Sequence, residues 1–244
     1  ALRIKPGDKV ITKTIDAGGM DWEGAARPYR GNPETGPFYI EGATPNDTLV
    51  VKIVRLRPNR DHAVSTHTPG FISAVASDHY TRMLNDPIPA RRYVWRLEKN
   101  RTVGVLDLLA SGKRLEVPLA PMRGRVAVAP AGQEAWGGLW PGNFGGNMDA
   151  SDVREGATVY LPIFHEGAYF YFGDGHALQG DAEICGSGLE TTMEVTFEFT
   201  LIKGKKIAWP RIENEEYIMT VGSVRPLSDA LRIAAVEMVE WLAA

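Results

Sequence analysis

Strict alternation at residues 194–202 constrains the fold more than any other feature of this sequence. Polar and apolar residues alternate along the segment. The apolar residues are Val195, Phe197, Phe199 and Leu201, and the polar ones are Glu194, Thr196, Glu198 and Thr200. Successive side chains of a β-strand point to opposite faces, whereas an α-helix repeats every ~3.6 residues. The run therefore predicts a strand with one face in a core and the other in water.

Further segments also predict strands. They are rich in β-branched and other apolar residues and are bounded by turn residues such as Gly and Pro. Residues 111–113 form a short connection typical of a hairpin between two of them. The expected strands are residues 9–15, 49–56, 101–108, 114–119, 194–202 and 216–221.

One segment, residues 227–242, has helical periodicity, with an apolar stripe formed by Leu227, Leu231, Ala234, Ala235, Met238 and Leu242. Residues 57–100 carry many arginines and are interpreted as an excursion from the sheet scaffold, partly helical at best. These patterns predict a mainly β chain folded as a single domain over residues 1–244. Its expected architecture is a β-sandwich or distorted barrel with the C-terminal helix packed against it.

Charge, hydropathy and cysteine content exclude several classes of protein. Lys and Arg number 27 against 30 Asp and Glu, which leaves no basic excess for a broad nucleic-acid surface. No apolar run approaches the ~18–20 residues needed to span a bilayer. A single cysteine excludes an internal disulfide and a multi-thiolate zinc site. We therefore expect neither a nucleic-acid nor a membrane partner.

Residues 142–149 form a polar, glycine-rich segment that is unlike scaffold. Glycine permits close approach of the backbone to a ligand. Asn147 and Asp149 are two residues apart and would share a face of an extended chain. The Asn147 amide offers both a donor and an acceptor, as recognition of a substrate amide requires. An ordinary polar loop built from turn residues is the alternative.

A second glycine-rich segment, residues 173–186, is denser in ionisable groups. Asp174 and His176 would share one face of an extended segment, and Asp181, Glu183 and Cys185 would share a face of the next. A histidine with two or three carboxylates suits zinc or another divalent metal, and it also suits acid–base work without a metal. The alternative is a hairpin with a polar outward face.

Two further residues have two interpretations each. Cys185 is either a nucleophile activated by a neighbouring base or a small buried apolar residue. Glu41 ends a short apolar run in residues 32–43. It either belongs to an ordinary tight loop and strand or points into a site.

Several motifs, in this order, resemble the acetamidase/formamidase family over nearly the whole chain. Residues 32–43 resemble its N-P-x-T-G-P-x-x-x-x-G-A signature, and residues 142–149 its G-x-x-G-G-N-x-D segment. Residues 161–168 and 173–186 resemble its pair L-P-V-x-x-x-G-A and G-D-G-H-x-x-Q-G-D-x-E-x-C-G. The resemblance implies a mainly β, cytoplasmic amidohydrolase of short aliphatic amides, assembled as a homo-oligomer of two or more subunits.

The residue types favour a bound divalent metal that activates water, with zinc preferred and calcium as the alternative. The expected ligands are Asp149, His176 and Glu183, with Asp174 as a further ligand or as the residue that orients His176. Asn147 would hold the substrate amide, and either Glu41 or Asp181 would carry a proton to the leaving ammonia. The rival mechanism uses Cys185 as nucleophile with a carboxylate base.

Two other functions stay open. Asp/Asn/Gly loops and six tryptophans also suit a non-catalytic β-sandwich that binds a small polar ligand or sugar through a divalent cation. Family members usually extend before the position of Leu2 and beyond that of Leu242. The chain is therefore expected to be shortened at both ends by truncation, by processing or as a shorter homologue, and an oligomerisation fragment is the third alternative.

Overall fold

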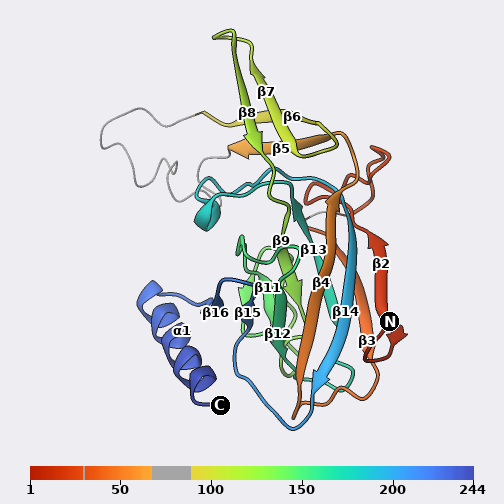
Figure 1. The fold of residues 1–244 in the computed structure, drawn as a ribbon, viewed down its shortest axis with the longest axis vertical. Coiled ribbons are helices and arrows are strands. Elements are labelled where there is room, and N and C mark those ends of the chain that lie inside the picture. Colours follow the sequence, from red (N-terminus) through yellow and green to blue (C-terminus); the bar gives the residue numbers. More distant parts are fainter. Residues whose placement is uncertain (30, 68–88) are drawn as a thin grey trace.

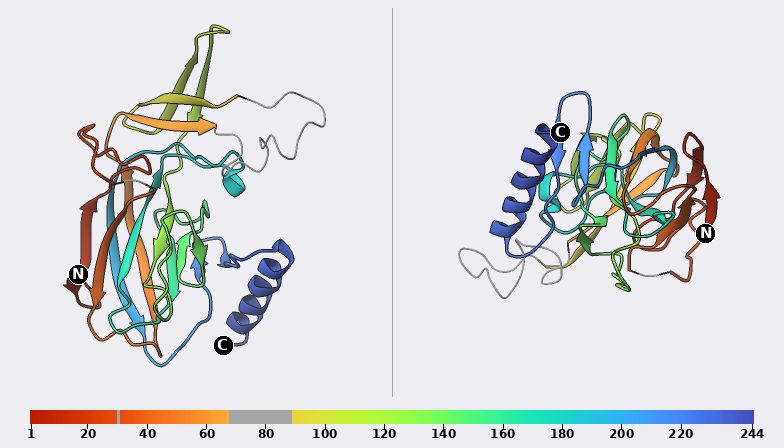
Figure 2. Two further views of the ribbon diagram at one scale, coloured as in Figure 1. Left: turned by 180° about the vertical axis from the view of Figure 1, so that it is seen from behind. Right: turned by 90° about the horizontal axis from the view of Figure 1, so that it is seen from below.

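The computed structural model describes residues 1–29, 31–67 and 89–244. Two six-stranded sheets face each other, and a four-stranded sheet lies at one end of them (Figures 1 and 2). The first sheet has the order β1 (Leu2–Ile4), β3 (Glu34–Ile40), β13 (Phe170–His176), β9 (Met122–Ala127), β11 (Gly145–Asn147) and β10 (Pro141–Gly142). The second has the order β16 (Ile218–Thr220), β15 (Arg211–Glu213), β12 (Thr158–Pro162), β4 (Thr48–Pro58), β14 (Met193–Ile202) and β2 (Lys9–Lys13).

The core between these two sheets is aromatic. Phe172 on β13 meets Phe197 on β14 edge to face with ring centroids 4.7 Å apart, and Phe170 meets Phe199 in the same way at 5.1 Å. All four rings are buried, whereas Thr200 on the opposite face of β14 is exposed. The alternation seen in the sequence is thus confirmed, and the mainly β sandwich with it. Among the described residues no sheet closes into a barrel.

The segment of residues 57–100 does leave the two facing sheets, but the prediction that it is partly helical is wrong where the structure describes it. The third sheet consists of β5 (His62–His67), β6 (Arg91–Glu98), β7 (Val103–Leu108) and β8 (Lys113–Pro118), so this part is extended and not helical. His79 and Arg82 lie outside the described residues. Arginines obscured the strand pattern: Arg96, for example, is exposed on β6 and pairs across strands with Asp107 at 2.6 Å. The inner face buries Ala63 and Leu97.

The C-terminal helix α1 (Leu227–Leu242) lies beside β15 and β16 (Figures 1 and 2), as predicted, but its apolar stripe does not form the buried side. Leu227 is 83% exposed and Leu231 is 70% exposed, whereas Ala230 and Glu237 are buried. A buried ion pair to β15 sets this rotation of the helix, as described below. No helix of the described residues has the length and hydropathy needed to cross a lipid bilayer.

Candidate functional site

The first sheet carries the centre of the site at the end of β13. Asp174 and His176 belong to this strand, and Asp149 follows β11, two strands away in the same sheet. Glu183 ends the short 3-10 helix η1 (Asp181–Glu183). Three of these acids have left-handed backbone angles, with φ of 46° at Asp149, 57° at Asp174 and 43° at Glu183. Such conformations are costly for residues other than glycine and concentrate at functional sites.

A fifth residue, Glu190, also lies in the acidic cluster, and bridges to two other strands position it there. Its backbone forms isolated bridges with His176 on one side and with Val64 of β5 on the other. The amide of Glu190 donates to the Val64 carbonyl at 2.8 Å, and the Val64 amide donates back at 2.9 Å. These bonds tie the end of the sandwich to the third sheet and hold the Glu190 side chain against the imidazole.

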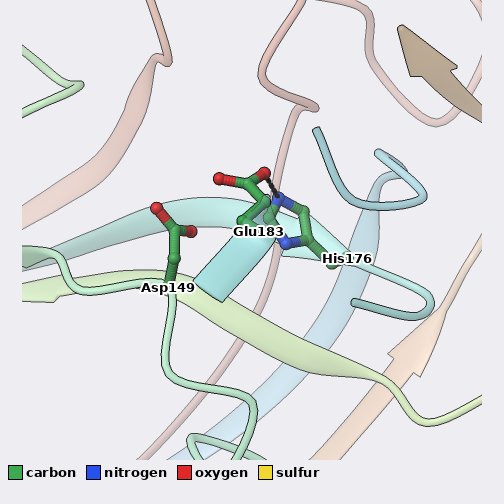
Figure 3. Close-up of side chains that lie close together, drawn as sticks. All are labelled: Asp149, His176 and Glu183. Carbon is green, nitrogen blue, oxygen red and sulfur yellow. Dashed lines mark ion pairs between the residues drawn. The ribbon is translucent and has the colours of Figure 1, made fainter. Parts of the chain in front are cut away.

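The imidazole of His176 lies at the centre of the acids. Its Nε2 is 3.1 Å from Oε2 of Glu190 and 3.2 Å from Oδ1 of Asp174. Glu183 Oε1 is 3.9 Å from the same nitrogen, and Figure 3 shows the Asp149 carboxylate on the far side of Glu183, in the same cluster. One ligand atom each from Asp149, His176 and Glu183 lie within 4.8 Å of one another.

Gln179 orients the imidazole through Nδ1, the ring nitrogen that does not face the carboxylates. Its Oε1 is 2.8 Å from His176 Nδ1, and its Nε2 donates to the backbone carbonyl of Asp149 at 2.6 Å. Because the amide nitrogen is committed to that carbonyl, the oxygen must face Nδ1 and accept its proton. With one proton held at Nδ1, the imidazole can offer the lone pair of Nε2 to a cation once Nε2 is deprotonated, as metal-binding histidines do.

The carboxylates lie close together and are buried, and both effects shift the pKa values of the site residues. Burial, together with the charges of Asp174 and Glu183, raises the pKa of Asp149 to about 8. Burial likewise raises the pKa of Glu190 to about 7. Burial alone would lower the pKa of His176, but the charges of Glu190 and Asp174 raise it well above its ordinary value. The site therefore has an excess of negative charge that protons relieve when no other cation does so.

The donor set fits a divalent cation. Asp149 Oδ1 is a buried oxygen that accepts no hydrogen bond from the described residues, which is unusual in proteins unless another group satisfies it. Gly124 on β9 keeps the space beneath the acids open, because a Cβ there would collide with carboxylate oxygens of both Asp149 and Asp174. Nitrogen and carboxylate ligands together are typical of zinc and related metals.

We expect stability without divalent metal to fall as the pH rises from about 5.5 to about 8.5. Folded-state pKa values of about 8 for Asp149 and about 7 for Glu190 exceed the ordinary values near 4, and that of His176 is also raised. The folded protein thus holds more protons than the unfolded chain across this range, so raising the pH favours unfolding. Saturating zinc should raise Tm by several degrees more at the upper pH, as scanning fluorimetry can measure. An equal rise in Tm at both pH values would contradict a cation bound by these groups.

Replacing Gln179 by Leu is expected to weaken metal binding about 10–100-fold, because the imidazole loses the acceptor that holds its Nδ1 proton. Zinc affinity measured by competition with a chromogenic chelator tests this. Gln133→Leu is the matched control, since Gln133 is exposed in a loop. Equal zinc affinity in the two variants would show that Gln179 does not orient the histidine.

Two asparagines lie beside the acids and line a cavity of 640 Å³. Asn32 donates through Nδ2 to Oδ1 of Asn147 at 2.9 Å, and Asn147 donates through Nδ2 to Oδ2 of Asp149 at 2.5 Å. The chain of amides thus leads from the cavity wall into the acidic cluster. Asp174, Glu183 and Glu190 border the same cavity.

The structure brings together Asn147, Asp149, Asp174, His176 and Glu183 of the predicted site residues, but it does not bring the other three to the cluster. Glu41 follows the far end of β3, about 20 Å of extended chain away from Glu34, which faces Gly173. Asp181 is exposed, where its Oδ1 accepts a hydrogen bond from Ser151. The half-buried thiol of Cys185 donates to the Ser187 carbonyl at 3.5 Å, and Cys185 does not border the 640 Å³ cavity.

Asp181, Glu183 and Cys185 do not share one face, contrary to the prediction from the sequence. Residues Asp181–Glu183 form a 3-10 helix, and a turn follows at residues 184–185, so the segment is not extended. At about three residues per turn, side chains two apart point in different directions. Glu183 therefore turns inward while its two neighbours turn away.

The sequence patterns did not indicate Glu190, Gln179 or Asn32 as site residues. Asn32 lies in the motif at residues 32–43 and Gln179 in the motif at residues 173–186. An amide side chain in a motif that also contains ionisable residues is a usable signal. Glu190 has no local signal, because only pairing with the third sheet places it beside His176.

Comparison with known proteins agrees with the motifs. A model of the "Acetamidase/Formamidase family" matches residues 109–236. A solved acetamidase from Yersinia enterocolitica is 36% identical and superposes with a TM-score of 0.84, covering 100% of this chain and 74% of its own. A solved protein from Thermoanaerobacter tengcongensis, described as a predicted acetamidase/formamidase, is 31% identical with a TM-score of 0.82, covering 98% and 76%. An acetamidase of Mycolicibacterium smegmatis is 26% identical over 79% of this chain, which spans 58% of that relative's length.

Proposed function

Because the chain belongs to the acetamidase/formamidase family, we propose that it hydrolyses short aliphatic amides such as formamide and acetamide, releasing ammonia and a carboxylate. One observation carries the proposal: a histidine and four carboxylates converge beside two asparagines at a cavity wall. The set comprises Asp149, Asp174, His176, Glu183 and Glu190.

A divalent cation held by His176 and these carboxylates, with zinc favoured over calcium, would supply Lewis acidity that polarises a carbonyl or acidifies water. Zinc is favoured because an imidazole nitrogen is among the donors, whereas calcium prefers oxygen ligands alone. Gln179 fixes the histidine and Gly124 leaves room beneath the acids.

The remaining residues have roles in binding and proton transfer. Asn147 and Asn32 present amide groups at the cavity wall and would orient the substrate amide by hydrogen bonds. Hydrolysis forms a bond from water oxygen to the carbonyl carbon, breaks the carbon–nitrogen bond and requires a proton on the departing nitrogen. Glu190 lies outside the group formed by Asp149, His176 and Glu183, and it would hold and pass that proton when those three residues bind the metal.

Ammonia release from formamide, acetamide and propionamide tests the proposal. The protein would be assayed as isolated, after chelation, and after zinc or calcium is restored. Activity that is lost on chelation and returns with one metal supports metal-dependent hydrolysis. A folded, metal-loaded protein that releases no ammonia would instead support the second candidate, a cation-dependent binding module, which the unpaired buried oxygen of Asp149 also suits.

We expect Cys185→Ala to retain kcat/KM for acetamide within about twofold, because the thiol does not border the cavity. Initial rates of ammonia release measure this, and Ser151→Ala is a comparable truncation near η1. Loss of activity in Cys185→Ala alone would favour the cysteine nucleophile over metal-assisted hydrolysis. Cytoplasmic location and assembly into a homo-oligomer also belong to the proposal, and light scattering of the purified protein tests the second.

A further inference from the structure

The cavity beside the acids is much larger than acetamide requires. Its volume of 640 Å³ lies within the range of about 300–1,000 Å³ that encloses drug-sized ligands. Part of the wall is apolar and includes Leu139 and Trp140. A substrate with a longer acyl chain would therefore leave less of this wall in contact with water.

Two arginines from separate elements border the same cavity. Arg92 lies on β6, where it pairs with Thr66 of β5, and Arg225 lies just before α1. Both are exposed, and among the described residues no carboxylate pairs with either guanidinium. Arg60, by comparison, is buried and pairs with Asp16 at 2.6 Å. Arg92 and Arg225 are thus available to an anion that enters the cavity.

The wall of this one cavity thus carries both acidic residues and arginines. Resting on the proposed amidase function, we propose that the preferred substrate is a half-amide of a short dicarboxylic acid. Its amide would lie at Asn147 and the acidic cluster, and its carboxylate at Arg92 and Arg225. Guanidinium groups bind carboxylates through short, charge-assisted hydrogen bonds, which would explain two arginines in a wall whose other charged residues are acids.

Succinamate illustrates the reaction. Water adds its oxygen to the amide carbonyl carbon, the carbon–nitrogen bond breaks, and the nitrogen leaves with the proton that it needs as ammonia. The products are succinate and ammonia, and the distal carboxylate takes no part in bond making or breaking. Its contribution is to binding and orientation, so it should change selectivity among amides.

Selectivity between two amides of matched shape is the decisive measurement. 4-Methylpentanamide replaces the carboxylate of succinamate by an isopropyl group of similar size. We expect the zinc-loaded protein to prefer succinamate by at least about tenfold in kcat/KM, the effect of one charge-assisted hydrogen bond. Arg225→Gln and Arg92→Gln should each reduce this preference about tenfold. Arg114→Gln on β8 is the control, because Arg114 pairs with Glu116 and does not border the cavity.

The outcomes separate this inference from the proposed function. Hydrolysis of acetamide without preference for succinamate, or a preference unchanged in both arginine variants, would overturn the inference and leave the amidase proposal standing. If no amide is hydrolysed, calorimetric titration of the zinc-loaded protein with succinamate decides. Binding that weakens about tenfold in Arg225→Gln but not in Arg114→Gln would support carboxylate recognition, and equal binding in both would overturn it.

Discussion

Replacing His176 by Gln is expected to lower kcat/KM for acetamide by about a thousandfold or more. The imidazole is fully buried, and among the described residues it is the one histidine in the acidic cluster. Loss of this ligand should remove the bound metal and with it an activation of several kcal/mol, where about 4 kcal/mol corresponds to about a thousandfold in rate. Ammonia release and metal content, measured on the same samples, should fall together.

His165→Gln is the matched control for this change. His165 is half-buried, and its Nε2 lies 2.7 Å from the Pro130 carbonyl, outside the cavity lining. The same substitution there should leave metal content unaltered. A His176→Gln protein that lost its metal but kept its activity would refute metal-assisted hydrolysis. Retention of both would refute the ligand role of His176 itself.

The second large effect concerns the attachment of α1. We expect Glu237→Ala to reduce the free energy of unfolding by about 3–5 kcal/mol, because it leaves a buried arginine without its counter-charge. Glu237 Oε2 accepts hydrogen bonds from Nε and Nη2 of Arg211 at 3.1 and 2.9 Å, and both side chains are at most 5% exposed. Trp241 covers the same guanidinium, with 5.3 Å between the ring centroid and the Arg211 carbon. Urea denaturation followed by tryptophan fluorescence measures the loss.

Glu240→Ala on the same helix provides the control, since Glu240 is exposed and its removal should change stability by less than about 0.5 kcal/mol. The double variant Arg211→Met/Glu237→Leu should recover most of the loss, because replacing both charges leaves no buried ion unpaired. Equal stability of Glu237→Ala and Glu240→Ala would show that the pair does not hold the helix.

Local pattern was sufficient for several elements of the site. Asp174 and His176 are two residues apart on one strand, so the period of a strand alone predicts that they lie together, and their side chains are 3.2 Å apart. Asn147 and Asp149 follow the same rule and are joined by a hydrogen bond. Long-range contacts were beyond this kind of reasoning. Glu34, and not Glu41, is the acid of β3 that lies beside the site, because pairing of β3 with β13 sets which end of the strand faces Gly173.

The sequence by itself determined the mainly β character, the core face of β14 and the presence of the C-terminal helix, because side-chain periodicity is a local property of the chain. Only the tertiary structure decided which face of α1 is buried, since the Arg211–Glu237 pair outweighs the apolar stripe in orienting it. It also decided the membership of the acidic cluster. Backbone hydrogen bonds to β5 place Glu190 in the cluster. The 3-10 helix and the turn after it direct Asp181 and Cys185 away from the cluster. These outcomes depend on contacts between segments far apart in the chain, which no local pattern encodes.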